Sequence, residues 1–342
     1  MKSSRFLICF LFITVLSAIQ NAHAQSTHDA ASTMKTIFNP TINGTWIGLG
    51  ISYGPYRDGE SPDKNSVTSE THILEDMDIL LNNGVHKWHL IRMYGADAAS
   101  EQVLRVIKKH QLPVQVMLGA WLSGKDPMED NRAQLDNVIR LANEYKGIVV
   151  AVNLGNEIFV DWSWHKFEID QIPLYLEWVD EVKSKVDVPV TLADDYNFWN
   201  KPWSQQVAEK LDFIVLHAYA MWNSQPLDSA VQWTADVYND IAKRHPSKQI
   251  ALGEAGWATS SIPTNGDERL IIAEASEDAQ SAFFTAYHAW LKENKVVSFY
   301  FEAFDEKWKG GEEKPDGIAE KNWGLYRSDR TPKKVIADKL VQ

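Results

Sequence analysis

The chain is nearly devoid of cysteine. Its 342 residues include one, Cys9, which falls in an N-terminal stretch with the features of a secretory leader. Lys2 and Arg5 supply a positive start, residues 6–19 are mostly apolar, and Ala-His-Ala at 22–24 is a typical cleavage site. The apolar run is too short for a membrane span, although an N-terminal anchor is the alternative interpretation. We expect residues 1–24 to be a signal peptide and the remainder to fold without disulfide bonds.

Basic residues are scarce relative to acidic ones. Lysine and arginine number 34 against 46 aspartates and glutamates, and the net charge is −12. This balance excludes a nucleic-acid-binding protein, whose surface carries basic faces, and it suits a neutral ligand. The 14 tryptophans and 11 tyrosines favour a carbohydrate ligand, because aromatic rings stack on the C–H faces of sugars.

Internal repeats and low-complexity linkers are absent from the sequence. We therefore expect a signal peptide at 1–24, a polar N-terminal lead at 25–43 and one domain at 44–342. The protein is expected to be a monomer without a membrane span, located outside the cell, in the periplasm or at the cell surface.

Apolar strand patterns alternate with helical patterns along the whole domain. Strands are expected at 44–53, 88–94, 113–121, 147–157, 189–193, 212–219, 249–253 and 296–301. Amphipathic helices are expected between them, for example at 67–82, 171–186 and 227–244, and a last helix is expected to start at Thr331-Pro332. Eight such repeats predict an α/β fold, a single-domain (β/α)8 TIM barrel, with an open doubly wound sheet as the alternative.

Two of the expected strands end in a glutamate. Residues 147–157 read GIVVAVNLGNE and end at Glu157, and residues 249–257 read QIALGEAGW and contain Glu254. Active sites of barrels lie at the carboxyl ends of the strands, so both glutamates are expected at one rim. Either glutamate alone would more often be a surface residue, but glycosidic bonds are cleaved by such carboxyl pairs, and together Glu157 and Glu254 are candidate catalytic residues. His217 and Tyr219 end another strand at this rim.

A phosphate-binding loop is excluded by the residues around Gly119. Gly119, Gly124 and Lys125 have its spacing, but Asp126 stands where a serine or threonine is needed to hold magnesium. We expect no cofactor and no metal.

The motifs around the expected strand ends resemble those of glycoside hydrolase family 17, the β-1,3-glucanases, and the bacterial laminarinase type in particular. They are Ser52-Tyr53-Gly54, Ile91-Arg92-Met93-Tyr94-Gly95, Gly155-Asn156-Glu157, Gly253-Glu254-Ala255-Gly256-Trp257, Phe301–Lys309 and Asn322–Tyr326. The resemblance covers nearly the whole chain after the leader. Strand six departs from it, because His217-Ala218-Tyr219-Ala220 stands where a version with proline is common.

The resemblance implies roles for single residues. Glu157 matches the acid/base and Glu254 the nucleophile of a retaining enzyme. Lys309 matches a cation that holds Glu306 and Glu320 after the last strand. The residues expected to bind substrate are Tyr53, Arg92, Tyr94, Asn156, His217, Tyr219, Trp257, Phe304, Glu306, Lys309, Glu320 and Trp323. Trp199, Trp222 and Trp308 are further candidates for stacking on sugars.

The expected activity is that of a glucan endo-1,3-β-glucosidase, which hydrolyses internal bonds of β-1,3-glucan such as laminarin by double displacement. A transglycosylase acting on the same glucan, a related barrel that cleaves mannan or mixed-linkage glucan, and a non-catalytic glucan-binding protein are the alternatives. Endo against exo action, the tolerance of β-1,6 branches and the number of sugar subsites stay open.

Overall fold

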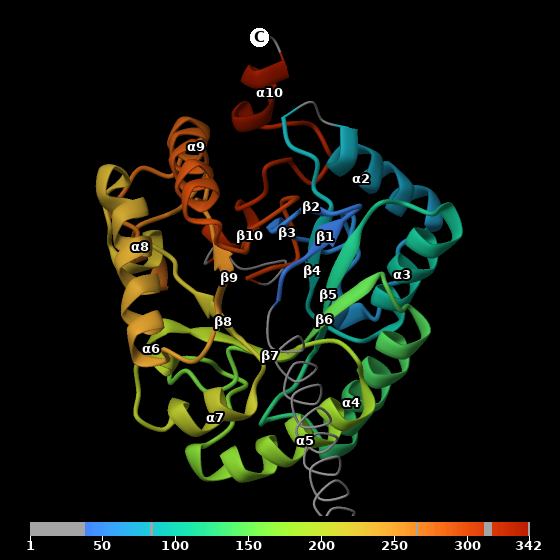
Figure 1. Ribbon diagram of the computed structural model, residues 1–342. Coiled ribbons are helices and arrows are strands. Elements are labelled where there is room, and N and C mark those ends of the chain that lie inside the picture. Colours follow the sequence, from blue (N-terminus) through green and yellow to red (C-terminus); the bar gives the residue numbers. More distant parts are fainter. Residues whose placement is uncertain (1–37, 83–84, 265, 311–316, 341–342) are drawn as a thin grey trace, which may run out of the picture.

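Eight parallel strands close into a barrel surrounded by helices (Figure 1). The computed structural model describes residues 38–82, 85–264, 266–310 and 317–340, so the expected signal peptide lies outside the described residues. The closed order is β10-β3-β4-β5-β6-β7-β8-β9, and Ser298 of β10 pairs with Leu49 of β3 to complete the ring. The predicted TIM barrel is confirmed.

The barrel strands lie within the expected segments, except that β7 and β9 run two residues beyond them. They are β3 (Leu49–Ser52), β4 (Leu90–Met93), β5 (Gln115–Ala120), β6 (Val149–Asn156), β7 (Val190–Asp195), β8 (Ile214–His217), β9 (Ile250–Ala255) and β10 (Ser298–Tyr300). Both faces of these strands are covered, one by the barrel interior and the other by helices, and this explains their continuous apolar runs.

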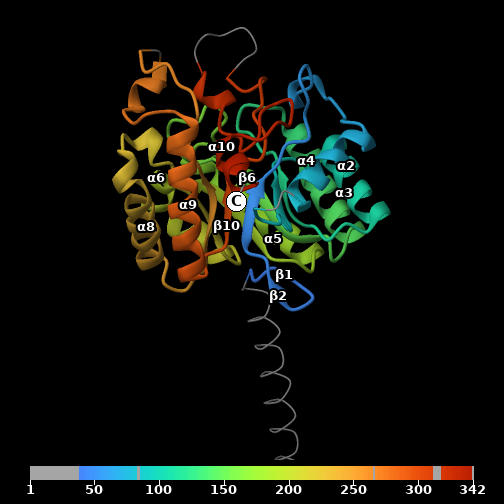
Figure 2. The same ribbon diagram turned by 90° about the horizontal axis from the view of Figure 1, so that it is seen from above.

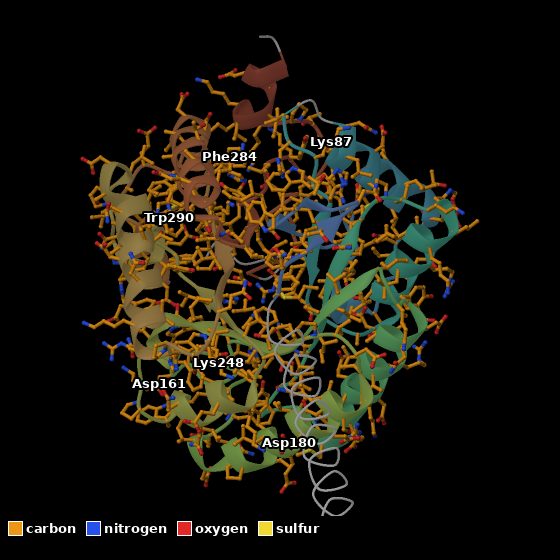
Figure 3. All side chains as sticks on the ribbon, in the orientation of Figure 1. Lys87, Asp161, Asp180, Lys248, Phe284 and Trp290 are labelled. Atoms are coloured by element: carbon orange, nitrogen blue, oxygen red, sulfur yellow. The ribbon has the colours of Figure 1, made fainter. Side chains whose placement is uncertain are left out.

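The outer layer consists of amphipathic helices whose apolar stripes pack against the barrel. They are α2 (Glu70–Asn82), α3 (Ala98–His110), α4 (Met128–Glu144), α5 (Ile172–Lys185), α6 (Tyr196–Trp199), α7 (Ser204–Lys210), α8 (Leu227–Arg244), α9 (Glu277–Asn294) and α10 (Lys334–Leu340). Side chains fill the space between helices and strands, as around Phe284 on α9, which is buried (Figure 3). Among the described residues, no helix is both long and apolar enough to cross a bilayer.

The end of the N-terminal lead closes one end of the barrel. β1 (Thr41–Ile42) and β2 (Thr45–Trp46) form a hairpin whose turn, Asn43-Gly44, has positive φ at both residues, as tight hairpins require. Phe38 is buried against the rings of Phe213 and Phe299 inside the barrel. The lead is therefore part of the folded domain from residue 38 onward.

The opposite end of the barrel carries the long loops. Figure 2 shows the β1–β2 hairpin at one end and the loops that follow β3, β9 and β10 at the other. The chain after β10 turns back toward that strand, since the amides of Asp305 and Tyr326 bond to the carbonyls of Tyr326 and Ala303. This rim brings together the carboxyl ends of β4, β6, β8 and β9, where the expected functional residues stand.

Candidate active site

Glu254 lies on β9 and has a donor on each carboxylate oxygen. Arg92 of β4 donates to Oε1 at 2.7 Å, Tyr94 donates to the same oxygen at 3.0 Å, and Tyr219 donates to Oε2 at 2.6 Å. The guanidinium of Arg92 is fully buried, so its charge is poorly screened by water. Arg92, expected from the sequence as a substrate-binding residue, thus holds the carboxylate of Glu254.

These partners favour the ionised form of Glu254. Burial raises the pKa of the carboxyl, but the neighbouring His217 and Arg92 and the hydrogen bonds from Tyr219 and Tyr94 bring the pKa below its ordinary value. Burial also lowers the pKa of His217 to about 4, so its imidazole is neutral near pH 7. Arg92 is therefore the positive charge that holds Glu254 as a carboxylate at neutral pH.

Glu157 follows β6 and has the opposite environment. Its backbone N–H bonds to Ala193 O at 2.8 Å, and its φ is 54°, in the left-handed region. Burial raises the pKa of the Glu157 carboxyl well above the ordinary value, and the negative charges of Glu254 and Asp195 raise it further. No cation bonds to this carboxyl among the described residues, so the protonated form is favoured.

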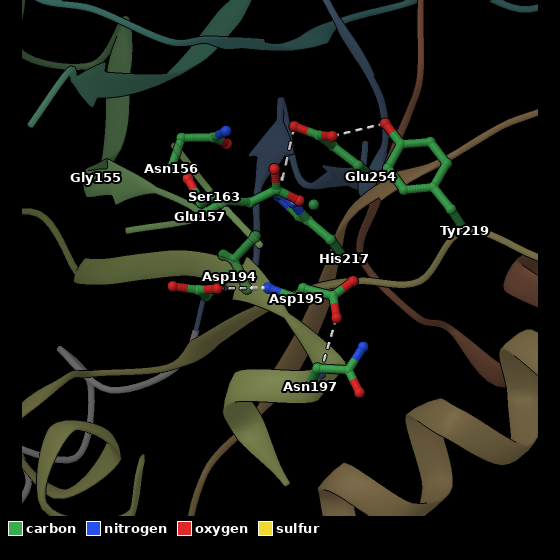
Figure 4. A network of polar contacts seen from close by, with 12 residues as sticks. Gly155, Asn156, Glu157, Ser163, Asp194, Asp195, Asn197, His217, Tyr219 and Glu254 are labelled. Atoms are coloured by element: carbon green, nitrogen blue, oxygen red, sulfur yellow. Dashed lines mark hydrogen bonds and ion pairs between the residues drawn. The ribbon is translucent and has the colours of Figure 1, made fainter. Parts of the chain in front are cut away.

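His217 lies between the two carboxyl groups (Figure 4). Its Nδ1 is 2.9 Å from Glu157 Oε1, and its Nε2 is 3.5 Å from Glu254 Oε1. One oxygen of each glutamate and one imidazole nitrogen all lie within 4.8 Å of one another, a grouping that could hold a metal ion. Arg92 stands 2.7 Å from Glu254 and opposes a second cation there, which favours the interpretation as a carboxyl pair.

The Asn156 side chain is oriented by Arg92. Its Oδ1 accepts from Arg92 Nη2 at 2.5 Å, so the amide NH2 faces the other way. An amide so fixed can donate to a hydroxyl of a bound ligand next to the carboxyl pair. Seven of the expected site residues are thus brought together at one rim: Arg92, Tyr94, Asn156, Glu157, His217, Tyr219 and Glu254.

Lys309 has one of the two partners that the resemblance implied, Glu306, and pairs with Glu302 in place of Glu320. Its ammonium pairs with Glu302 at 2.5 Å and with Glu306 at 2.9 Å, and Glu320 is not among its ion pairs in the described residues. The negative Glu320 is close enough for the charges of Lys309 and Glu254 to act on its pKa, which burial raises. Gly54 makes room for this cluster, because a Cβ there would lie 2.1 Å from Glu306 Oε1.

Three residues expected to contact substrate lie in the core instead. Tyr53 donates its hydroxyl to buried Asp76, and the indole N–H of Trp257 bonds to Glu274 O at 3.0 Å. Phe304 packs under the guanidinium of Arg330, 4.2 Å from its ring centre. All three are at most 2% exposed, so we correct their role to packing.

Other expected stacking residues are also covered. Trp199 is fully buried and its indole N–H bonds to Val215 O at 3.1 Å. Trp323 is fully buried, and its ring lies edge-on to that of Tyr219 with centroids 5.1 Å apart. It therefore packs against the tyrosine that donates to Glu254 and does not face solvent. Trp222 and Trp308 are half-buried.

The sequence analysis did not identify Asp194 and Asp195, which stand at the end of β7 near the carboxyl pair. Asp194 is buried and accepts from the backbone N–H of Phe159 at 2.9 Å, which ties the segment after Glu157 to β7. Asp195 accepts from the N–H of Asn197 at 2.8 Å, and its charge acts on Glu157 (Figure 4). The signal was available, since two aspartates follow the apolar run of residues 190–193 just as Glu157 follows its own run.

A family model described as the BtgE/BtgC glycoside hydrolase domain matches residues 50–324. This range includes the carboxyl pair and the donors around it. The chain belongs to the BtgE/BtgC glycoside hydrolase family. The O-glycosyl hydrolase class expected from the two glutamates is confirmed at this level.

Fungal relatives of this glycoside hydrolase have names that refer to glucan. A "Glucan 1,3-beta-glucosidase" of Arthroderma benhamiae is 28% identical over 303 residues, which cover 83% of this chain and 89% of that protein. A "Putative glucan endo-1,3-beta-glucosidase btgC" of Aspergillus niger is 27% identical over 289 residues, or 80% of this chain. The chain spans only 40% of the length of the latter.

Solved structures with the same fold include two glycosidase-type barrels. An endo-laminarinase from Formosa Hel1_33_131 has a TM-score of 0.73 at 24% identity, covering 86% of both chains. A glycoside hydrolase family 17 β-1,3-glucanosyltransferase from Rhizomucor miehei has a TM-score of 0.66 at 19% identity, covering 84% of this chain and 96% of that one. At these identities the likeness shows the shared barrel alone.

Proposed function

We propose that this BtgE/BtgC glycoside hydrolase is a retaining enzyme of glycoside hydrolase family 17 that cleaves internal β-1,3-glucosidic bonds of glucan. One observation carries the mechanism. Glu157 and Glu254 have oxygens within 4.8 Å of each other, and their pKa values move in opposite directions. Retaining glycosidases place the two carboxyls about 5–5.5 Å apart, whereas inverting ones need about 6.5–9.5 Å to admit water.

In the first step, Glu157 gives its proton to the glycosidic oxygen while Glu254 attacks the anomeric carbon. The C–O bond to the leaving sugar breaks, and an ester forms between Glu254 and the retained sugar. Asn156 donates to the 2-hydroxyl of that sugar, because Arg92 holds its amide with the NH2 outward. Such a bond strengthens as charge develops in the oxocarbenium-like transition state.

In the second step, Glu157 takes a proton from water and the water oxygen attacks the anomeric carbon. Glu254 leaves as a carboxylate, and the donors Arg92, Tyr94 and Tyr219 stabilise its returning charge. Neutral His217 favours an ionised Glu254 and a protonated Glu157 when its single proton is on Nε2, the nitrogen 3.5 Å from Glu254 Oε1. Its Nδ1 then accepts a hydrogen bond from protonated Glu157 at 2.9 Å, and this bond stabilises the neutral, protonated form of the acid.

The choice of substrate is supported by the relatives. Those of Arthroderma benhamiae and Aspergillus niger are named for action on glucan 1,3-β bonds. A neutral polysaccharide also suits a chain with a net charge of −12. No cofactor has a part in the proposed steps.

The proposal is tested on a panel of laminarin, cellulose, mannan and mixed-linkage β-glucan. We expect laminarin to be hydrolysed fastest, with a mixture of short oligosaccharides as early products. NMR of the first product should show the β-anomer before mutarotation. Equal rates on cellulose and laminarin would defeat the substrate assignment, and an α-anomer as first product would defeat retention. The ratio of hydrolysed to transferred product in the same reactions separates a hydrolase from a transglycosylase.

We further propose that the enzyme is exported by its leader and works as a monomer. The N-terminal sequence of the secreted protein should begin at Gln25, which follows Ala24. A secreted form that retains residues 1–24 would contradict the cleavage site, and a dimer in light scattering would contradict the oligomeric state.

A further inference from the structure

Two tryptophans stand in solvent on the loop that follows Glu157. Trp162 is 60% exposed and Trp164 is 69% exposed, while the residues beside them, Ser163 and His165, point inward and are buried. Single exposed apolar residues are ordinary on protein surfaces, but two large rings held out from one loop at the active rim indicate a ligand-binding surface.

The loop holds these rings in place. Phe167 N–H bonds to Ile158 O at 2.7 Å, closing the base of the loop, and Gly124 N–H bonds to His165 O at 2.8 Å, joining it to the loop after β5. Phe159 and Phe167 are buried beneath it. A ligand that stacks on the rings therefore loses little binding free energy to ordering of the loop.

The tryptophans are continuous with the candidate active site. His165 Nε2 lies 2.8 Å from the backbone oxygen of Asn156, the residue before Glu157. The His165 ring stacks on half-buried Trp121, with centroids 4.7 Å apart. The ring of Trp164 lies edge-on to the same His165 ring, with centroids 5.1 Å apart. Trp121, His165 and Trp164 thus form an aromatic row that starts beside the proposed proton donor.

The position of the row decides which part of a glucan it can reach. Glu157, directly after β6, protonates the oxygen that departs with the leaving sugar, while Glu254, on β9, attacks the sugar that is retained. The row stands on the loops after β5 and β6 and is therefore on the leaving-group side. Charge favours a neutral ligand there, because Asp161, labelled in Figure 3, pairs with Lys166 at 3.5 Å on the same loop.

We propose that the aromatic row and Trp162 bind the sugar residues of β-1,3-glucan on the leaving-group side of the cleaved bond, and the acceptor sugar when one replaces water. The sugars stack their C–H faces on the indoles of Trp162 and Trp164. This inference rests on the proposed function, because the polarity of the cleft follows from the roles given to Glu157 and Glu254.

The test compares the full-length secreted enzyme with Trp162→Ala, Trp164→Ala and the double variant. Trp290→Ala is the control, because this half-buried ring lies in the helix layer on α9 and packs against Tyr238 and Tyr287 (Figure 3). We expect kcat/KM on laminarin to fall about 3- to 10-fold for each tryptophan, the loss typical of one aromatic contact. On an aryl β-laminaribioside, whose leaving group is a phenol, all three variants should equal the wild type. Reducing-end-labelled laminarihexaose should be cut with fewer sugars on the leaving side.

Equal losses on both substrates, or no loss on either, would overturn the proposal. A change from dimer to monomer with unchanged kinetics would show instead that the rings cover a contact between two copies. Inactivity of the wild type on both substrates would refute the proposed function. In that case laminaripentaose binding, followed by tryptophan fluorescence, decides the inference separately: a response lost in Trp164→Ala supports it, and a response kept in the double variant contradicts it.

Discussion

Tyr219→Phe removes one hydroxyl that donates to the carboxyl pair, and it leaves the ring and its packing in place. The hydroxyl donates to Glu254 Oε2 at 2.6 Å, while the ring packs edge-on to Trp323 and Phe301. The variant therefore isolates the hydrogen bond. In the second step of the proposed mechanism Glu254 leaves as a carboxylate, so this donor stabilises charge that develops in the transition state.

The magnitude follows from the bond. A hydrogen bond to a charged group contributes about 1.5–3 kcal/mol, so kcat should fall about 10- to 100-fold. On an activated aryl glycoside, whose first step is fast, KM should fall together with kcat because the glycosyl-enzyme accumulates. The acidic limb of the pH–rate profile should move to higher pH, since losing a donor to the ionised form raises the pKa of Glu254 and leaves more of it protonated.

Tyr287→Phe is the control for this variant. Its hydroxyl is buried and bonds to Ser298 Oγ at 2.7 Å, away from the carboxyl pair. It should lose some thermal stability and keep both kcat and the pH profile. An unchanged kcat and an unmoved acidic limb in Tyr219→Phe would refute the role given to this hydroxyl.

Three further predictions follow from the same site. In Asp195→Asn the loss of a negative charge near Glu157 lowers the pKa of the proton donor, so the basic limb of the pH profile should move to lower pH; an unmoved limb would contradict this. Lys309→Met leaves Glu302 and Glu306 without their cation, so the free energy of unfolding in denaturant should fall by about 3–5 kcal/mol. The variant should also lower kcat more than KM. Adding Glu302→Gln should restore part of the stability. Glu254→Ala should lose several orders of magnitude in kcat, and azide should restore turnover with a glucosyl azide of inverted configuration.

Much of the fold and the centre of the site could be predicted because both depend on short-range sequence order. An apolar run ended by Asn156-Glu157 or by Glu254 places polar groups at the carboxyl end of a strand, and barrel closure then brings those ends together. The contacts of Arg92 and His217 with this pair follow from the same geometry.

The errors concern residues beyond the strand ends. There the direction of a side chain depends on how the loop turns, as with Trp257, which points to the helix layer and bonds to Glu274. Glu302 pairs with Lys309 because backbone hydrogen bonds to residues 323–326 fix the position of the chain after β10. No local sequence pattern predicts these contacts. The exposure of Trp162 and Trp164 likewise depends on the buried base of their loop.

The central claim is that Glu254 forms a covalent bond with the sugar, and trapping that bond tests it most directly. A 2-deoxy-2-fluoro-β-laminaribioside with a dinitrophenolate leaving group slows the second step more than the first, so the intermediate persists. After digestion, mass spectrometry should find the added disaccharide on the peptide that contains Glu254, and none in the Glu254→Ala variant. Labelling at Glu157 or at any other residue, or inhibition without a covalent adduct, would contradict the account.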